Sequence, residues 1–255
     1  MNTTQEFLDN LQYTELSILN YEEIFGHNYI SPGGEEVADQ FIRTLELRPQ
    51  MRVLDIGCGL GGPAFRMAGK FGVYVHCIDL SSNMIRIAKT RLDEEGLNNM
   101  VTLEQGDCLE MQIDSTYDVV HSRDVFLHIE DKARLFEVIR KSLVSGGRLG
   151  FSDYCLGKTK SSPEFESYLS ERNYTLHNVE DYTKLLENSG FTNVFGEDRT
   201  DIFIKTLKQE LHILEKAILN NQEKSALRQV WQEKLTRAER GEQCWGWFSG
   251  IKKTQ

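Results

Sequence analysis

The chain has 255 residues, a formal net charge of −10 at pH 7, and a composition of 40% hydrophobic and 27% charged residues. This length suits one large α/β domain, and the composition excludes a fibrous repeat or a wholly disordered chain. The negative charge disfavours a nucleic-acid partner, which binds to a basic face. No stretch reaches the roughly 18 uninterrupted apolar residues of a membrane helix, and the first residues lack the features of a secretory signal. We therefore expect a cytoplasmic protein without nucleic-acid or membrane partners. We also expect a monomer, although neither composition nor charge determines the oligomeric state.

Helical segments at both ends flank a central region of alternating strands and helices. The spacing of apolar residues predicts helices over 3–25 and 34–47. Next, short β-rich runs alternate with amphipathic helices, which is typical of a mostly parallel sheet covered on both faces. We expect strands at 51–56, 74–78, 100–105, 117–121 and 148–153, and helices at 63–71, 82–95 and 131–143. Further helices are predicted at 162–169, 179–189 and 207–240, and a last strand at 244–251.

The cysteines and histidines indicate neither a disulfide framework nor a metal centre. The five cysteines are scattered without a CxxC pair, and the six histidines include no HExxH pattern. We therefore expect reduced thiols and no bound metal.

A glycine-rich turn, Asp-Ile-Gly-Cys-Gly-Leu-Gly-Gly at 55–62, directly follows the first core strand. Parallel sheets of this kind open their ligand crevice there, and glycines permit a tight turn and the close approach of a cofactor. Gly57, Gly59 and Gly62 also satisfy the GxGxxG fingerprint of dinucleotide-binding proteins, with Asp79 as the ribose acid at the end of the next strand. The glycines alone leave a dehydrogenase open.

Carboxylates at three successive strand ends separate the two kinds of cofactor. Asp55 would repel a pyrophosphate, but it suits the cationic end of S-adenosylmethionine. Asp107, just after the third strand, can accept a hydrogen bond from an adenine amine. Together with Asp79 and the loop at 55–61, these acids resemble the pattern of the class I S-adenosylmethionine-dependent methyltransferases. The resemblance implies an α/β, Rossmann-like fold with a mostly parallel seven-stranded sheet.

Two of these acids also have a purely structural interpretation. Asp79 lies just before Ser81 and Ser82, either of which could cap the next helix. Asp107 could be an ordinary turn residue. A dehydrogenase would need hydride-transfer residues as well, and the only similar segment, 154–158, contains a glycine and directly follows a strand.

Short motifs outside the glycine turn carry a more specific resemblance. They lie at 10–14, 21–26, 29–34, 122–128, 152–154, 172–175 and 245–248. In their order they resemble the phosphoethanolamine methyltransferases of nematodes, plants and apicomplexan parasites. The family implies N-methylation of phosphoethanolamine, or of its monomethyl and dimethyl forms, towards phosphocholine. We expect one domain over 1–255, with N-terminal lid helices at 1–47, a cofactor-binding core at 48–155, and substrate-side helices and closing strands at 156–255.

The resemblance also implies roles for individual residues. Tyr13 and His128 are implied to face each other as a hydrogen-bonded pair that deprotonates the amine and closes the site, while Asp124 attracts the ammonium group. Arginine and lysine suit a phosphate group through charge-assisted hydrogen bonds. The implied substrate residues are Gln12, Tyr21, Ile30, Ser31, Asp124, Tyr154, Arg172, Tyr174 and Lys234. The implied cofactor residues are Ser31, Asp55, Gly57, Gly59, Asp79, Leu80, Asp107, Cys108 and Arg123.

Without the family context, the residue patterns leave these roles open. His128 ends an apolar run and could be a core residue, and Tyr13 and Tyr21 could be packing aromatics. Arg172 and Lys234 could be surface ion-pair partners.

Three further expectations concern Arg123 and Asp124, the aromatic cluster near the end of the chain, and the other histidines. Asp124 could form a local salt bridge with Arg123, which we otherwise expect to support the cofactor acids. The aromatic cluster at 245–248 is expected to be core strand. No catalytic role is indicated for His27, His76, His121, His177 and His212.

Three other functions also stay open. The same fold and cofactor could serve another acceptor, such as glycine, sarcosine or a sterol. The chain could be a cofactor-binding but inactive partner of a second methyltransferase, or a NAD-dependent dehydrogenase. The sequence does not indicate how many methyl groups the substrate amine already carries.

Overall fold

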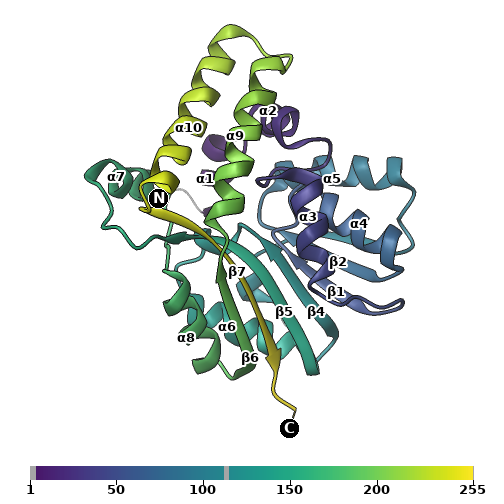
Figure 1. Ribbon diagram of the computed structural model, residues 1–255. Coiled ribbons are helices and arrows are strands. Elements are labelled where there is room, and N and C mark those ends of the chain that lie inside the picture. The colour runs from purple at the N-terminus through teal and green to yellow at the C-terminus, as the bar shows by residue number, and fades with distance from the viewer. Residues whose placement is uncertain (1–3, 112–114, 255) are drawn as a thin grey trace.

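The computed structural model describes residues 4–111 and 115–254, which form a seven-stranded sheet with helices on both faces (Figure 1). The strand order is β3-β2-β1-β4-β5-β7-β6. β1 to β5 are parallel, and β7 lies antiparallel between β5 and β6. This confirms the predicted α/β class with a mostly parallel seven-stranded sheet. The strands are β1 Arg52–Ile56, β2 Tyr74–Asp79, β3 Val101–Gln105, β4 Tyr117–Arg123, β5 Leu143–Leu156, β6 Phe191–Asp198 and β7 Gln243–Lys252.

Successive residues of a strand point to opposite faces of the sheet and pack under different helices. Val53 of β1 belongs to an apolar cluster that includes residues of three helices on one face. Its neighbour Leu54 belongs to a second cluster with residues of two helices on the other face. Both faces are therefore covered, as parallel sheets require. The first set of helices is α3 Gly34–Arg43, α4 Gly62–Phe71 and α5 Ser82–Glu95, and the second is α6 Lys132–Ser142 and α8 Val179–Asn188.

The remaining helices gather at the carboxyl ends of the parallel strands. α9 (Thr200–Lys216) and α10 (Asn221–Glu239) lie side by side there, next to α2 (Figure 1). The α1–α2 segment, residues 4–25, consists of α1 Thr4–Phe7, a π-helix Leu8–Gln12 and α2 Glu15–Phe25. A short helix, α7 Pro163–Glu171, follows β5. Among the described residues, no helix combines the length and the apolar character that crossing a membrane would require.

Two predicted helices are wrong as single elements. The helix expected over 3–25 is interrupted at Tyr13 and Thr14, where the Thr14 side chain accepts from Ser17 N and starts α2; residue 3 lies outside the described residues. The helix expected over 207–240 is split at 217–220, because Asn220 and Glu223 form a capping box that starts α10. In both cases the apolar spacing continues across the break, so periodicity alone does not reveal it.

β6 (Phe191–Asp198) is a strand that the sequence pattern does not locate. It lies at the edge of the sheet, most of its residues are partly or fully exposed, and its register with β7 shifts between Thr192 and Phe195. A half-exposed, irregular edge strand lacks the strict alternation by which strands are recognised. β5 also begins earlier than expected, at Leu143 directly after α6.

Candidate functional site

A cavity of about 890 Å³ opens at the carboxyl ends of the parallel strands, between the turns that follow them and the α1–α2 segment. Its walls also include the segment 168–175 and part of α10. Every site residue predicted from the sequence lines this cavity. The fold therefore gathers side chains from the first and last parts of the chain around one space.

The backbone of the glycine-rich turn requires glycine where it meets the cavity. Gly57 and Gly59 have φ angles of 70° and 55°, in the left-handed region. A Cβ atom on Gly57 would lie 2.3 Å from a methyl group of Val125, so no larger residue fits. Gly57 N donates to the carbonyl of Ile78 (2.7 Å), which holds the turn against the end of β2.

Asp79 lines the cavity and also takes part in the start of α5. Its Oδ2 accepts from Gly59 N and its Oδ1 from Ser81 N, both at 2.9 Å. Ser81 in turn caps α5 by accepting from Met84 N (3.2 Å). Burial raises the pKa of Asp79 to about 6, against the opposing effect of the two backbone hydrogen bonds. The cofactor interpretation and the capping interpretation thus describe the same turn.

Asp55 is buried at the end of β1, with 1% of its surface exposed. Its Oδ1 lies 2.7 Å from His121 Nδ1, while its Oδ2 has no hydrogen-bond partner. The two residues are register neighbours on β1 and β4. His121, for which the sequence indicates no role, is therefore the residue that holds this carboxylate. Only the pairing of β1 with β4 reveals it.

Asp107 has the turn role that the sequence allows, and its role toward an adenine amine stays a prediction. Its side chain accepts from Leu109 N (2.9 Å) and caps the 3-10 turn Cys108–Glu110, and it also lines the cavity. Beside it, burial raises the pKa of Cys108 to about 12, so this thiol stays neutral at physiological pH. Leu80 completes this wall.

Arg123 contacts the loop before α3 and the ring of Trp245, and its support of the cofactor acids stays a prediction. Its Nη2 donates to the carbonyl of Pro32 (2.8 Å), its guanidinium lies 5.9 Å from the Trp245 ring centroid, and Nε and Nη1 have no partner. Arg123 and Asp124 form no hydrogen-bonded ion pair within the described part of the chain, so the local salt bridge is absent. Through its hydrogen bond to Pro32, Arg123 holds the loop that precedes α3 in place.

Tyr13 and His128 meet across the cavity. Tyr13 Oη lies 3.2 Å from His128 Nε2, and the His128 ring also packs edge-on against Tyr174. Tyr13 is the residue that ends the π-helix, so its side chain lies at the break between the π-helix and α2. Burial, with smaller effects from Lys132 and Arg172, lowers the pKa of His128 to about 4. The imidazole is therefore neutral near pH 7, and its Nε2 can accept a proton.

Asp124 lines the cavity and has one carboxylate oxygen without a hydrogen-bond partner. Its Oδ1 accepts from Trp245 Nε1 (2.6 Å) and Ser152 Oγ (3.0 Å), whereas Oδ2 is buried without a partner. The backbone has a φ of 57°, which turns the residue away from the line of β4. Burial raises the pKa of Asp124, opposed by the charge of Arg123 and by these hydrogen bonds. Trp245 is core strand as expected, but it is also the donor that orients this acid.

A buried lysine of α10 also lines the cavity. Lys234 of α10 is 7% exposed, its Nζ is 3.2 Å from Tyr154 Oη, and it stands over the ring of Trp231. Burial lowers the pKa of Lys234 to about 8, although the carboxylate of Glu210 opposes the shift. Glu210 itself accepts from Trp231 Nε1 (2.8 Å) and from Gly33 N (2.7 Å). The sequence singles out neither Trp231, which lines the cavity, nor Glu210, which accepts from its ring nitrogen.

Arg172 is only partly exposed, and its guanidinium lies 5.7 Å from the Tyr168 ring centroid. Neither Arg172 nor Lys234 takes part in an ion pair within 4 Å among the described residues, which argues against their being surface ion-pair partners. Tyr174 Oη accepts from Gln12 Nε2 (2.7 Å). The lining of the cavity thus includes two cationic groups without an ion pair among the described residues, together with Asp124 and the Tyr13–His128 pair.

The other predicted substrate residues come from the α1–α2 segment and the loop after it. Tyr21 packs against the ring of Trp231, and Ile30 lies over Gly59, where a Cβ atom would be 2.9 Å from its side chain. Ser31 lines the same wall. In the described residues, no group of three or more His, Cys, Asp or Glu side chains is arranged to hold a metal ion.

Comparison with known proteins agrees with this architecture. Residues 47–234 match the family model described as "Methyltransferase domain". The chain is 44% identical to phosphoethanolamine N-methyltransferase 1 of Zea mays, over 97% of this chain and 50% of the relative, so it spans about half the length of such plant relatives. It is 34% identical to phosphoethanolamine N-methyltransferase of Plasmodium falciparum, over 99% of this chain and 97% of the relative.

A solved structure resembles the whole chain. Phosphoethanolamine N-methyltransferase 2 of Haemonchus contortus, in complex with phosphomonomethylethanolamine and S-adenosylhomocysteine, superposes with a TM-score of 0.96 and 32% identity, covering 100% of this chain and 61% of the other. With the sheet order and the glycine turn beside the cavity, these matches make the chain a methyltransferase domain. Within that class, it belongs to the phosphoethanolamine N-methyltransferase family.

Proposed function

We propose that this chain transfers methyl groups from S-adenosylmethionine to the nitrogen of phosphoethanolamine, or of its monomethyl and dimethyl forms, towards phosphocholine. The observation that carries the proposal is that one cavity is lined both by cationic groups without an ion-pair partner and by a carboxylate oxygen without a hydrogen-bond partner. Lys234 and Arg172 line the cavity without an ion pair within 4 Å among the described residues, and Asp124 lines it with Oδ2 buried and without a hydrogen-bond partner. A substrate with a phosphate and an ammonium group joined by a short spacer would give both kinds of group a partner.

The residues beside the glycine turn fit S-adenosylmethionine. Asp55 Oδ2 is buried without a partner, so a cationic group beside it would satisfy an otherwise costly buried acceptor. Asp79 and Asp107 line the same wall and can accept from ribose hydroxyls and an adenine amine. Bound there, the cofactor supplies a methyl group on a positively charged sulfur.

The phosphate end would bind the substrate through charge and aromatic hydroxyls. Lys234 and Arg172 would donate charge-assisted hydrogen bonds, which are about twice as strong as neutral ones. A dianionic phosphate would also favour the protonated form of Lys234, whose pKa burial lowers to about 8. Tyr154, already in contact with Lys234, and Tyr174 supply neutral donors.

At the amine end, the residues would orient the nitrogen and remove its proton. An ammonium group has no lone pair, so it must lose a proton before it can attack. Asp124 Oδ2 would attract the nitrogen, and the proton would pass to Tyr13 Oη while the tyrosine proton moves to the neutral His128 Nε2. Holding the nitrogen in line with the methyl group supplies much of the remaining catalysis.

The decisive experiment is a substrate panel. Purified chain is incubated with labelled S-adenosylmethionine and, separately, phosphoethanolamine, its monomethyl form and its dimethyl form, with glycine, sarcosine and a sterol as other acceptors. We expect transfer to at least one phosphobase and inhibition by phosphocholine. Transfer to a neutral acceptor alone, or tight cofactor binding without transfer to anything, would reject the proposal.

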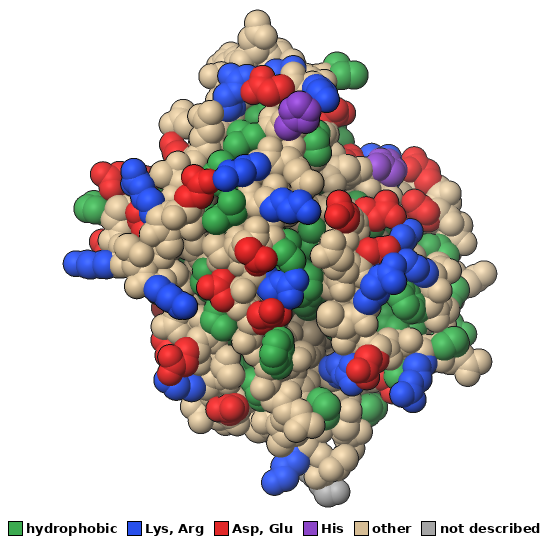
Figure 2. Space-filling view, viewed as in Figure 1, with side chains coloured by type: hydrophobic (Ala, Val, Ile, Leu, Met, Phe, Trp, Pro, Cys, Tyr) green, Lys and Arg blue, Asp and Glu red, His purple; other side chains and the backbone are tan. Residues whose placement is uncertain are grey.

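We also propose that the chain acts as a single-domain cytoplasmic monomer without nucleic-acid or membrane partners. Over the face shown in Figure 2, acidic and basic side chains are interspersed and no broad basic area stands out, which supports the absence of a nucleic-acid partner. Light scattering at working concentration is expected to give the mass of a monomer, and thermal unfolding is expected to show one cooperative transition. A dimer mass or two separate transitions would contradict this.

A further inference from the structure

We infer that Asp9 is a positioning residue: its carboxylate docks the α1–α2 segment onto the first turn of α5, and so sets Tyr13 against His128 and links closure of the cavity to the cofactor acid Asp79. The inference deepens the proposed function and rests on it for the roles of Tyr13 and Asp79. The sequence motifs do not include Asp9.

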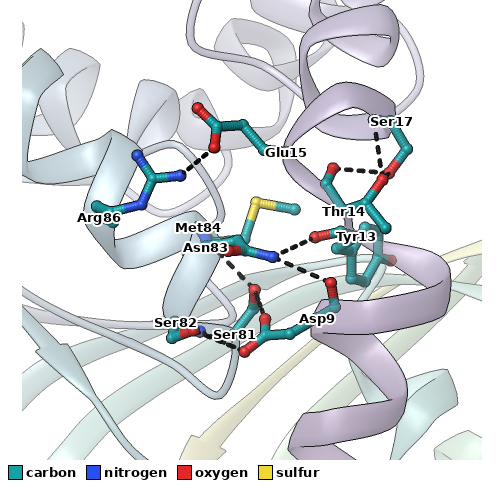
Figure 3. A network of polar contacts seen from close by, with 10 residues as sticks. All are labelled: Asp9, Tyr13, Thr14, Glu15, Ser17, Ser81, Ser82, Asn83, Met84 and Arg86. Atoms are coloured by element: carbon teal, nitrogen blue, oxygen red, sulfur yellow. Dashed lines mark hydrogen bonds and ion pairs between the residues drawn. The ribbon is translucent and has the colours of Figure 1, made fainter.

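The Asp9 carboxylate receives three donors from the start of α5 (Figure 3). Its Oδ1 accepts from Ser81 Oγ (2.5 Å), and its Oδ2 accepts from Ser82 Oγ (2.7 Å) and Ser82 N (3.2 Å). Ser81 is the capping residue and Ser82 the first residue of a 14-residue helix. A negative charge is stabilised there by the helix dipole and by the free backbone N–H groups. The contact is therefore stronger than a single hydrogen bond between neutral groups.

The first turn of α5 also holds the α1–α2 segment through a second set of hydrogen bonds. Asn83 Nδ2 donates to the backbone carbonyls of Asp9 (3.1 Å), in the first turn of the π-helix, and of Tyr13 (3.0 Å), directly after it (Figure 3). Tyr13 follows that turn directly, and its hydroxyl reaches His128 Nε2 at 3.2 Å. The backbone position of Tyr13, and with it the contact to His128, is thus set by α5.

Ser81 connects this docking contact to the cofactor wall. Its Oγ donates to Asp9 Oδ1, while its backbone N–H donates to Asp79 Oδ1. A ligand that binds Asp79 orders this turn, and the docked α1–α2 segment orders the same turn from the other side. Each event then lowers the entropy cost of the other, so the coupling must act in both directions.

A second polar contact between the same elements provides a matched control. Arg86 of α5 pairs with Glu15 of α2 at 2.7 Å, but the two side chains are 56% and 58% exposed (Figure 3). Exposed ion pairs of this kind contribute little. Removing Glu15 therefore deletes a carboxylate of the same segment without removing the docking contact.

The test compares Asp9→Ala with Glu15→Ala by hydrogen exchange and by kinetics. In the unaltered chain, S-adenosylhomocysteine should slow amide exchange across residues 4–25. Asp9→Ala should raise exchange there about tenfold or more and lose the ligand effect, with exchange in the sheet unchanged. Its kcat/KM for the phosphobase should fall about 10- to 100-fold, as expected for hydrogen bonds to a charged group. Glu15→Ala should stay within about threefold in each measurement.

Unchanged exchange over residues 4–25 in Asp9→Ala, or equal effects of the two substitutions, would overturn the inference. If Asp9→Ala does not fold, Ser82→Ala replaces it in the test. This substitution removes the Ser82 hydroxyl that donates to Asp9, so it should change amide exchange and kcat/KM in the same direction but by less. The exchange measurements need no turnover. A chain that methylates no phosphobase but shows the predicted exchange pattern would refute the proposed function and leave the docking role standing.

Discussion

Replacing Tyr13 by phenylalanine removes one hydroxyl group from the site and keeps the ring. In the structure, Tyr13 Oη lies 3.2 Å from His128 Nε2 and receives a longer contact, 3.4 Å, from Gln12 Nε2. Gln12 keeps its shorter bond to Tyr174, so the main loss falls on His128. The substitution therefore tests one atom and one contact.

The expected size of the effect depends on what that contact does. If the pair only holds the cavity closed, losing a hydrogen bond between neutral groups costs about 0.5–1.5 kcal/mol, or about 2- to 12-fold in rate. If the pair carries the substrate proton, the loss should reach about 10²- to 10⁴-fold. Because burial keeps His128 neutral near pH 7, we expect the larger effect, in kcat rather than in KM.

The assay is steady-state transfer of labelled methyl groups to a saturating phosphobase, with single-turnover measurements to separate chemistry from product release. Tyr74→Phe removes the same group from a half-exposed tyrosine of β2 and should change nothing. A Tyr13→Phe variant with kcat within about twelvefold of the unaltered chain would refute the proton-transfer role and leave only closure.

Three further outcomes are expected. Arg172→Ala should raise KM for the phosphobase about 10-fold or more with a smaller change in kcat, and an unchanged KM would remove Arg172 from the phosphate pocket. Trp245→Phe removes the 2.6 Å donor to Asp124 and should lower kcat/KM by about tenfold or more, which a normal kcat/KM would contradict. Burial lowers the pKa of His128 from 6.5 to about 4, so the unfolded chain binds a proton there that the folded chain does not; the stability from this group is complete above about pH 6.5 and lost towards pH 4. His128→Asn should flatten that part of the curve of Tm against pH, and an identical curve would contradict the shift.

Local patterns were sufficient for most of the core. The period of two in the central strands and the three- and four-residue spacing of the crossover helices are properties of neighbouring residues, so β1 to β4 and α4 to α6 lie close to the predicted ranges. The need for glycine at position 57 is equally local, because it follows from a positive φ angle. Features that depend on distant neighbours were missed, among them the edge strand β6 and the break at Tyr13.

The sequence by itself determined the fold class, the glycine turn and, through family resemblance, the side chains that surround the cavity. Only the tertiary structure decided which of them touch. Asp55 meets His121 because β1 pairs with β4, and Asp124 meets Trp245, 121 positions further along, because β7 inserts beside β5. Sheet order joins these residues, and it is settled by the packing of the whole chain rather than by the residues on either side of each one. For the same reason, the docking of Asp9 on α5 has no sequence signature.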